Sequence, residues 1–193
     1  MIANSKKIII ALAILAICPV RQYALHLEAG LFFGPRTVLD NRISEVYGHA
    51  SVYYPYLAFG LWKGLAIGVG NEGGYSKAGQ IGLYKEPTTL EMGGTEFFIR
   101  YEHPLAMVFP SIKIGYGPYS YKQIIQSPHT GGRAVDHHKN ALSFGAGVRI
   151  FPLKGLFLAI EIKYVPLKVR PFEDEVDLGG MRYLVGIGYR LSL

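Results

Sequence analysis

The last fifteen residues of the chain, 179–193, alternate between two kinds of side chain. Every second residue from Met181 to Leu193 is apolar or aromatic. The residues between them are small or charged, apart from Leu184. Successive side chains of a β-strand point to opposite faces, so the pattern predicts a strand with one apolar face and one face that carries Arg182 and Arg190. The apolar face continues to the final residue, which is uncommon at the end of a soluble domain.

Seven earlier segments show the same period of two. With the terminal segment, we expect strands at about 26–33, 51–61, 65–75, 94–102, 111–117, 142–150, 158–164 and 179–193. The faces of 51–61 stay unassigned because Pro55 interrupts any ladder and is typical of a bulge or an unpaired end. After residue 24, only 37–46 is compatible with a short helix.

The connections between these strands alternate between long and short. The segments 34–48, 76–93, 120–140 and 166–178 are long and polar, whereas 62–64, 103–104 and 152–155 are short turns. All short turns therefore lie at one end of the sheet, together with both ends of the strand region. An even-stranded meander of this kind can close on itself and leave no unpaired edge.

The two faces of the strands predict which solvent surrounds the barrel. One face is bulky and apolar, whereas the other combines glycine and alanine with charge, and a soluble ligand-carrying barrel would need large apolar side chains inside. The sequence therefore predicts an all-β, eight-stranded antiparallel up-and-down transmembrane β-barrel with lipid outside and charge inside. The expected interior charges are Glu28, Glu72, Glu96, Arg100, Glu102, Lys113, Arg149, Glu161, Lys163, Arg182 and Arg190. The aromatic residues expected at the two membrane interfaces include Trp62, Tyr101, Tyr116, Tyr164, Tyr183 and Tyr189.

The first 24 residues have the character of a secretory signal peptide. Lys6 and Lys7 precede an unbroken apolar run at 8–17, which is too short to span a bilayer. We expect a signal peptide at 1–24 and a barrel domain at 25–193, exported to the bacterial outer membrane. Without Lys6, Lys7 and Arg21, 17 basic residues remain against 14 acidic ones. This mild excess, with no basic cluster beside stacking aromatics, gives no reason to expect nucleic-acid binding.

The signal peptide, the eight-strand meander and the ending GIGYRLSL at 186–193 together resemble the small outer-membrane β-barrel proteins of Gram-negative bacteria. The likeness is to the OmpA transmembrane domain and to adhesin-like porins, and it covers 25–193. It implies contact with outer-membrane lipid and lipopolysaccharide, and recognition of the last strand by the outer-membrane assembly machinery. That family usually ends on an aromatic residue, whereas this chain has Leu193.

Interior charge and long loops are the first two candidate sites. An eight-stranded barrel encloses little more than side-chain volume, so we expect a paired network that plugs the interior, with a narrow solute channel as the alternative. The loops are expected to give a structural or adhesive role, with a host or other cell surface as a possible ligand. Their basic residues form an expected outer rim of Arg36, Arg42, Lys77, Lys85, Lys122, Arg133, Lys139, Lys168 and Arg170.

The third candidate is a group of polar residues in the segment 120–140. Ser127, His129, Asp136, His137 and His138 contain the residue types of a hydrolytic site, so a lipid-modifying enzyme is a further alternative. No motif fixes their geometry, and neighbouring histidines in a polar loop lack a defined set of further metal ligands. We therefore expect no enzymatic activity, no metal and no cofactor.

Overall fold

The computed structural model of the chain describes residues 25–82, 85–105, 107–126, 133–170 and 175–193. The predicted signal peptide at 1–24 lies outside the described residues, and so do Ser127 and His129. Among the described residues, no helix is both long enough and apolar enough to cross a membrane.

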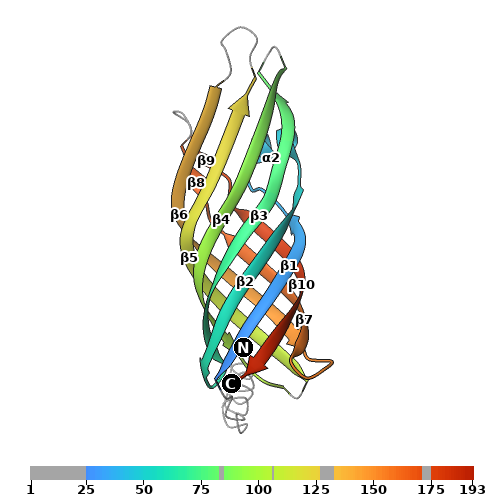
Figure 1. Ribbon diagram of the computed structural model, residues 1–193. Helices are drawn as coiled ribbons and strands as arrows, with labels where there is room; N and C mark the ends of the chain where they lie inside the picture. The colour runs from blue at the N-terminus through green and yellow to red at the C-terminus, as the bar shows by residue number, and fades with distance from the viewer. Residues whose placement is uncertain (1–24, 83–84, 106, 127–132, 171–174) are drawn as a thin grey trace, which may run out of the picture.

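Eight antiparallel strands form a closed barrel (Figure 1). Each strand pairs with the next, and the last strand pairs with the first, so the predicted eight-stranded up-and-down barrel is confirmed. The first and last residues of the barrel lie side by side at the end that carries the short turns. The strands are β1 (His26–Arg36), β2 (Ala50–Trp62), β3 (Leu65–Ile81), β4 (Glu86–Glu102), β5 (Val108–Ile125), β6 (Arg133–Ile150), β7 (Leu156–Val165) and β10 (Gly180–Ser192).

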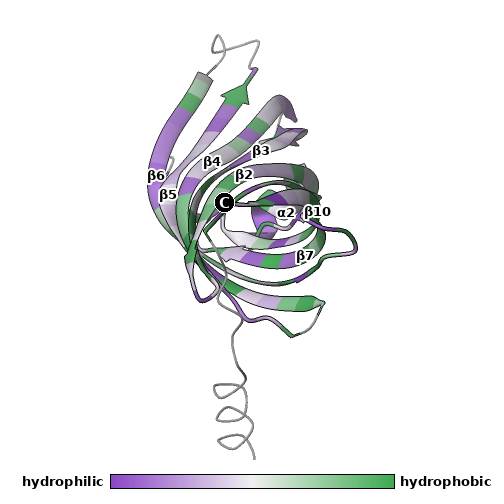
Figure 2. Ribbon diagram, turned by 60° about the horizontal axis from the view of Figure 1, so that its bottom comes forward, coloured by the Kyte–Doolittle hydropathy of each residue, from purple (hydrophilic) through white to green (hydrophobic). Residues whose placement is uncertain are grey.

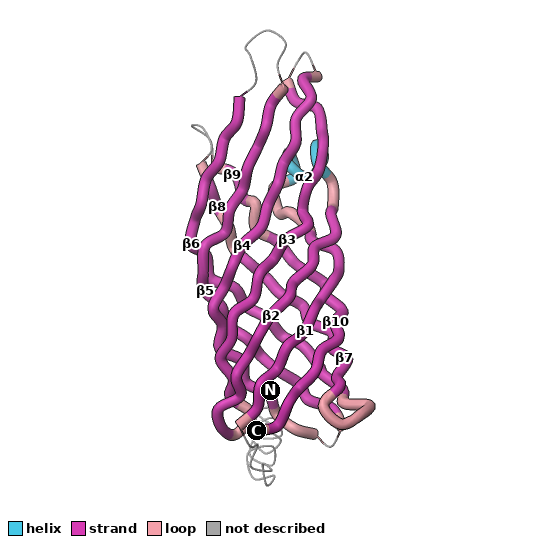
Figure 3. Tube along the Cα trace, in the orientation of Figure 1, coloured by secondary structure: helices cyan, strands magenta, loops and turns pink. Residues whose placement is uncertain are grey.

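Two of the predicted long connections are largely strand. The expected loops at 76–93 and 120–140 are wrong, because β3 to β6 are 17 or 18 residues long and rise above the other four strands (Figure 1, Figure 3). In these extensions the pattern of faces is inverted. Leu90 and Tyr121 point inward and are buried, whereas their neighbours Glu91 and Lys122 point outward and are exposed. The outward residues of these extensions are polar, so a search for apolar outward residues does not detect them.

The other two long connections hold small elements of their own. The helix α2 (Asn41–Tyr47) begins later than the predicted 37–46, and Asp40 is its N-cap. The last connection contains a two-stranded sheet of β8 (Lys168–Val169) and β9 (Val176–Asp177). The hydroxyl of Tyr47 lies 3.0 Å from that of Thr88, which ties α2 to the inner face of β4.

The outward surface changes from apolar to polar at one level of the barrel. On β6 the exposed side chains of Ile150, Phe144 and Leu142 are followed by those of Asn140 and His138. The same change occurs on β5, where Tyr116 precedes Lys122. We call the apolar zone the lipid belt; it lies on the half of the barrel that carries the short turns. Figure 2 shows hydrophobic and hydrophilic residues alternating along the strands.

Buried aromatic side chains occupy much of the barrel interior, to which the sequence pattern assigned mostly glycine, alanine and charge. Several of these rings lie over a glycine that is the direct partner on the neighbouring strand. A Cβ atom added to any of these glycines would lie within 2.5 Å of the ring. The absence of a side chain on one strand therefore makes room for an aromatic ring from the next. The pairs are Gly30 with Tyr56, Gly94 with Tyr119, Gly186 with Phe32, and Gly188 with Phe157.

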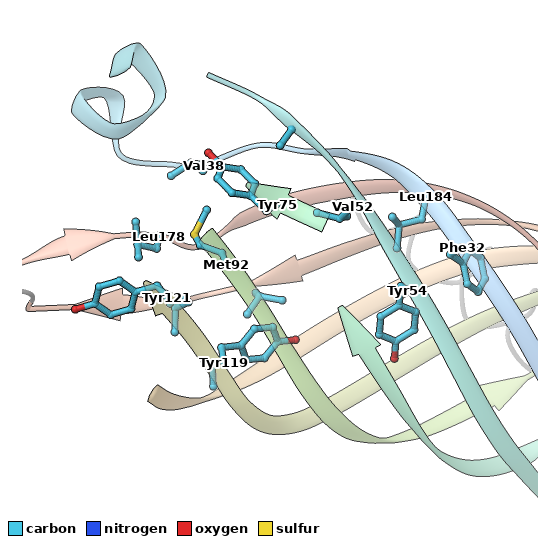
Figure 4. Packing of buried hydrophobic residues seen from close by; sticks show 14 of the residues in the cluster. Phe32, Val38, Val52, Tyr54, Tyr75, Met92, Tyr119, Tyr121, Leu178 and Leu184 are labelled. Carbon is cyan, nitrogen blue, oxygen red and sulfur yellow. The ribbon is translucent and has the colours of Figure 1, made fainter. Parts of the chain in front are cut away.

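An apolar cluster covers the charged interior on the side of the strand extensions. Figure 4 shows Tyr75, Met92, Tyr121 and Leu178 meeting beyond Tyr54 and Phe32. We call this cluster the apolar cap. It contains Val38, Tyr47, Val52, Tyr75, Leu90, Met92, Tyr119, Tyr121, Leu167, Val169 and Leu178, all buried.

Candidate functional site

Charged side chains fill the centre of the barrel in three connected groups. The first lies nearest the short turns, where Glu28 and Glu102 are bound by three arginines. Arg190 reaches both carboxylates at 2.6 Å. Arg100 lies 2.8 Å from Glu28 and 2.9 Å from Glu102, and Arg149 lies 2.7 Å from Glu102. Each acid therefore faces more than one cation, which offsets part of the cost of burying its charge.

The second group lies at mid-height and combines lysine with tyrosine. Lys113 pairs with Glu161 and with Glu96, whose carboxylate also lies 3.1 Å from Lys163. The hydroxyl of Tyr54 donates a hydrogen bond of 2.6 Å to Glu96. The ammonium groups of Lys113 and Lys163 lie 4.6 and 4.4 Å from the centre of the Tyr54 ring. Tyr54 was not predicted as an interior residue, because the faces of the segment 51–61 were left unassigned.

The third group ties the barrel to its outer connections. Glu72 accepts hydrogen bonds from Arg36 at 2.9 Å and from Arg182 at 3.1 Å. Arg36 also donates to the backbone oxygen of Leu178 at 2.9 Å, just before β10. The prediction of Arg36 on the outer rim is wrong, because its side chain is fully buried. The period of two continues through Gly34 and Pro35 and turns Arg36 inward.

The three groups bring together all eleven charged residues that the sequence predicts for the interior, with Arg36 in addition. The result is a layer of seven bases and five acids that are cross-linked from strand to strand. The bases are Arg36, Arg100, Lys113, Arg149, Lys163, Arg182 and Arg190, and the acids are Glu28, Glu72, Glu96, Glu102 and Glu161.

The six aromatic residues predicted for the interfaces lie on the outer surface of the barrel. Trp62, Tyr101 and Tyr189 lie near the short turns, because Trp62 and Tyr101 both pair with Leu65 and Tyr189 pairs with Leu156. The other three lie further along their strands. Tyr116 and Tyr183 are exposed and Tyr164 is half-buried.

The two described histidines of the 120–140 segment lie on opposite faces of β6 and contact different partners. His138 lies on one face of β6 with Asp136, and their nearest charged atoms are 3.7 Å apart. His137 lies on the other face, where its ring stacks on that of Tyr121 at 5.6 Å. Within the described ranges, no group of three or more histidine, cysteine, aspartate or glutamate residues is arranged to hold a metal ion.

Three of the predicted rim cations gather instead at a cleft between β6 and β8. The cleft has a volume of about 410 Å³, and we call it the β6–β8 cleft. Lys139 donates a hydrogen bond to the backbone oxygen of Lys168, and Glu175 lies 3.3 Å from Lys168 and 3.6 Å from Arg170. The hydrogen bond and charge of Lys168, with the charge of Arg170, hold the pKa of the Glu175 carboxyl below its usual value. The lining residues are Tyr121, His137, His138, Lys139, Lys168, Val169, Arg170 and Glu175.

Solved structures of outer-membrane barrels share this fold. The crystal structure of the outer membrane protein OprG from Pseudomonas aeruginosa aligns with a TM-score of 0.63 and 10% identity, over 90% of this chain and 98% of that chain. The attachment invasion locus protein Ail of Yersinia pestis, in complex with the heparin analogue sucrose octasulfate, aligns with a TM-score of 0.57 and 11% identity, over 88% and 99%. Neisserial surface protein A aligns with a TM-score of 0.53 and 11% identity, over 90% and 99%. No protein-family model and no curated sequence matches the chain.

Proposed function

We propose that this protein is an outer-membrane β-barrel with a plugged interior, and that it serves adhesion through the strand extensions and connections outside the lipid belt. The observation that carries the proposal is the contrast between the two halves of the molecule. The interior is crossed by buried, paired charges and covered by the apolar cap, whereas β3 to β6 carry a wide polar sheet beyond the lipid belt. Such a molecule is built to display a surface rather than to conduct solutes.

The neighbours in fold support the membrane assignment. OprG is an outer membrane protein, and Ail is named for attachment and invasion. On this proposal the segment 1–24 directs export, the last strand is read by the assembly machinery, and the lipid belt contacts outer-membrane lipid and lipopolysaccharide. The exposed row of leucine, isoleucine, phenylalanine and valine side chains on the barrel exterior would be costly in water and is stabilising in lipid.

The plug is tested by electrical recording. The refolded protein is inserted into planar bilayers, and its folded state is verified by heat-modifiable migration in detergent gels, so that a silent membrane cannot be mistaken for failed insertion. We expect no steady conductance. Reproducible single-channel steps from the heat-modifiable species would overturn the plugged interior and favour the narrow channel.

Adhesion is tested on living cells. Bacteria that display the protein are compared with the same strain lacking it for attachment to coated surfaces, before and after brief trypsin treatment. We expect attachment to depend on the protein and to fall after trypsin, because Lys77, Lys122 and Arg170 lie in the extensions and connections outside the lipid belt. Equal attachment by both strains would leave the adhesive role without support.

A further inference from the structure

We propose that the β6–β8 cleft binds an anionic saccharide through a sulfate or phosphate ester. The inference deepens the adhesive function proposed above and rests on it for the orientation of the cleft toward the outside of the cell. Its basis is a set of cations that converge on one cleft, together with a buried hydroxyl that lines the same cleft and has no hydrogen-bond partner among the residues that the structure describes.

The charges that line the cleft are unbalanced. Lys139 comes from β6, and Lys168 and Arg170 come from β8 and the residue after it, whereas Glu175 is the one acid among the described lining residues. Glu175 bridges Lys168 and Arg170, and its own side chain is 46% exposed. A bound ester anion can take the place of this carboxylate and bind the same two cations, because sulfate and phosphate oxygens accept charge-assisted hydrogen bonds in the same way.

The floor of the cleft provides the second, independent observation. Tyr121 is only 3% exposed, yet its hydroxyl has no hydrogen-bond partner among the described residues. A buried polar group without a partner is costly, so an unpaired hydroxyl that lines a cleft indicates a place for a ligand oxygen. Tyr121 points away from the charged interior and toward the outer end of the barrel (Figure 4).

The walls of the cleft suit a sugar ring. The imidazole of His137 stacks on Tyr121, and Val169 contributes an apolar surface beside it. The volume of about 410 Å³ lies within the range of small-molecule sites. The cleft also lies clear of the lipid belt, since Lys139 is three residues beyond Leu142 on β6, or about 10 Å along the strand.

Binding is measured on the full barrel, folded in detergent micelles and verified by heat-modifiable migration. The probes are fluorescent dextran sulfate, fluorescent uncharged dextran and lipopolysaccharide with or without core phosphates. We expect the protein to bind dextran sulfate and not uncharged dextran, and its affinity for dextran sulfate to fall as the salt concentration is raised. Stronger binding to phosphorylated than to dephosphorylated lipopolysaccharide would identify the cell's own surface as the source, whereas equal binding would point to an external sulfated polymer.

Four variants separate the cleft from general surface charge. Arg170→Ala should weaken dextran sulfate binding about tenfold, and Tyr121→Phe, which keeps the ring, should weaken it about threefold. Lys122→Ala is the matched control, because Lys122 is the next residue on β5 and is exposed on the opposite face; its effect should stay within about twofold. Glu175→Gln should tighten binding about threefold, because it removes the competing carboxylate.

The reversed sign of Glu175→Gln makes the outcome decisive, since damage to the fold would weaken binding rather than strengthen it. Equal losses of affinity for dextran sulfate in Arg170→Ala and Lys122→Ala, or weaker binding by Glu175→Gln, would overturn the proposal that the β6–β8 cleft is the binding site. In that case attachment of cells displaying Arg170→Ala, if unchanged, would show that the adhesive function stands without it.

Discussion

At the scale of single residues, each buried acid of the interior depends on several cations at once. Glu72 is the clearest example, because it binds Arg36, Arg182 and Lys163 from three different strands. A buried ion pair gains little over a well-packed apolar pair, but removal of one partner leaves the other charges without compensation. Single substitutions in this network are therefore expected to cost far more than the pairs themselves contribute.

Glu72→Gln should reduce the free energy of unfolding by about 3 to 5 kcal/mol, because three cations lose the carboxylate that they share. The measurement is urea unfolding of the refolded barrel in detergent, followed by heat-modifiable migration. Glu91→Gln provides the control, since Glu91 is exposed on the outer face of the β4 extension. A Glu72→Gln barrel as stable as the Glu91→Gln barrel would show that the network does not contribute to stability in this way.

Asp40 shows a smaller effect of the same kind outside the membrane. Its carboxylate accepts hydrogen bonds from the backbone and side chain of Arg42, and these bonds hold the pKa of Asp40 below its usual value. A lowered pKa in the folded state means that Asp40 stabilises α2 at neutral pH, and that this contribution is lost as the pH falls through the folded pKa.

Asp40→Ala should therefore expose α2 to local unfolding, at a cost of about 1 kcal/mol at neutral pH. The expected observation is faster amide hydrogen exchange in 41–47 at pH 7, with a smaller difference between the two proteins at low pH. Ser51→Ala, an exposed position on β2, is the control for surface substitution. Unchanged exchange rates at neutral pH would argue against a stabilising role of Asp40 as the N-cap of α2.

At the scale of the strand, the sequence pattern predicted the elements that lie in lipid and missed the parts that leave it. Tyr116 and Ile114 repeat the apolar period on β5, so the belt portion of that strand is visible in the sequence. Beyond the belt, the outward side chains are polar and the inward side chains pack against the apolar cap. The sequence of such a strand extension therefore resembles that of a polar loop. Strand ends such as Ile81 and Ile125 depend on tertiary packing, which no local period records.

The packing of inward aromatic rings over glycines was missed for a related reason. A glycine in a strand gives no signal of what covers it, because its partner is far away in the sequence. Phe32 covers Gly186, and 154 positions separate them in the numbering of the chain. The charges of the interior were predictable from their own strands, whereas the aromatic layer around them required the register of the whole sheet.

Gly186→Ala should destabilise the barrel by about 1 to 3 kcal/mol, because its Cβ would lie 2.4 Å from the ring of Phe32. Gly145→Ala is a suitable control, since the nearest atoms to its Cβ would belong to the side chains of Lys113 and Glu161, at 3.2 Å or more. The double variant Gly186→Ala with Phe32→Leu should recover part of the loss in urea unfolding. A lack of difference between the two alanine variants would contradict the paired packing of glycine and ring.

At the scale of the whole molecule, two layers of different chemistry are stacked along the barrel axis. The half with short turns has a lipid belt outside and charge inside, and the other half has a polar exterior and an apolar cap. The chain contains a single tryptophan, Trp62, which is 62% exposed at the short-turn edge of the belt. It therefore reports the position of the bilayer relative to the barrel.

In vesicles of brominated lipid, the fluorescence of Trp62 should be quenched most by bromine near the headgroups. A tryptophan moved to the middle of the belt, in Trp62→Phe with Ile99→Trp, should be quenched most by bromine deep in the chains. Emission from Trp62 that no brominated lipid quenches would place the bilayer elsewhere on the barrel.

The contact between the two ends of the barrel has a consequence for chain order. The backbone nitrogen of Leu193 donates a hydrogen bond of 2.9 Å to the oxygen of Leu25, so the strands form a ring in space. A circular permutant, joined there by a short linker and opened in the turn between Leu153 and Lys154, would retain every ladder. We expect it to refold in detergent with the same heat-modifiable shift. If the assembly machinery reads the final strand, the permutant would fail to reach the outer membrane in cells, which would separate the information for folding from the information for delivery.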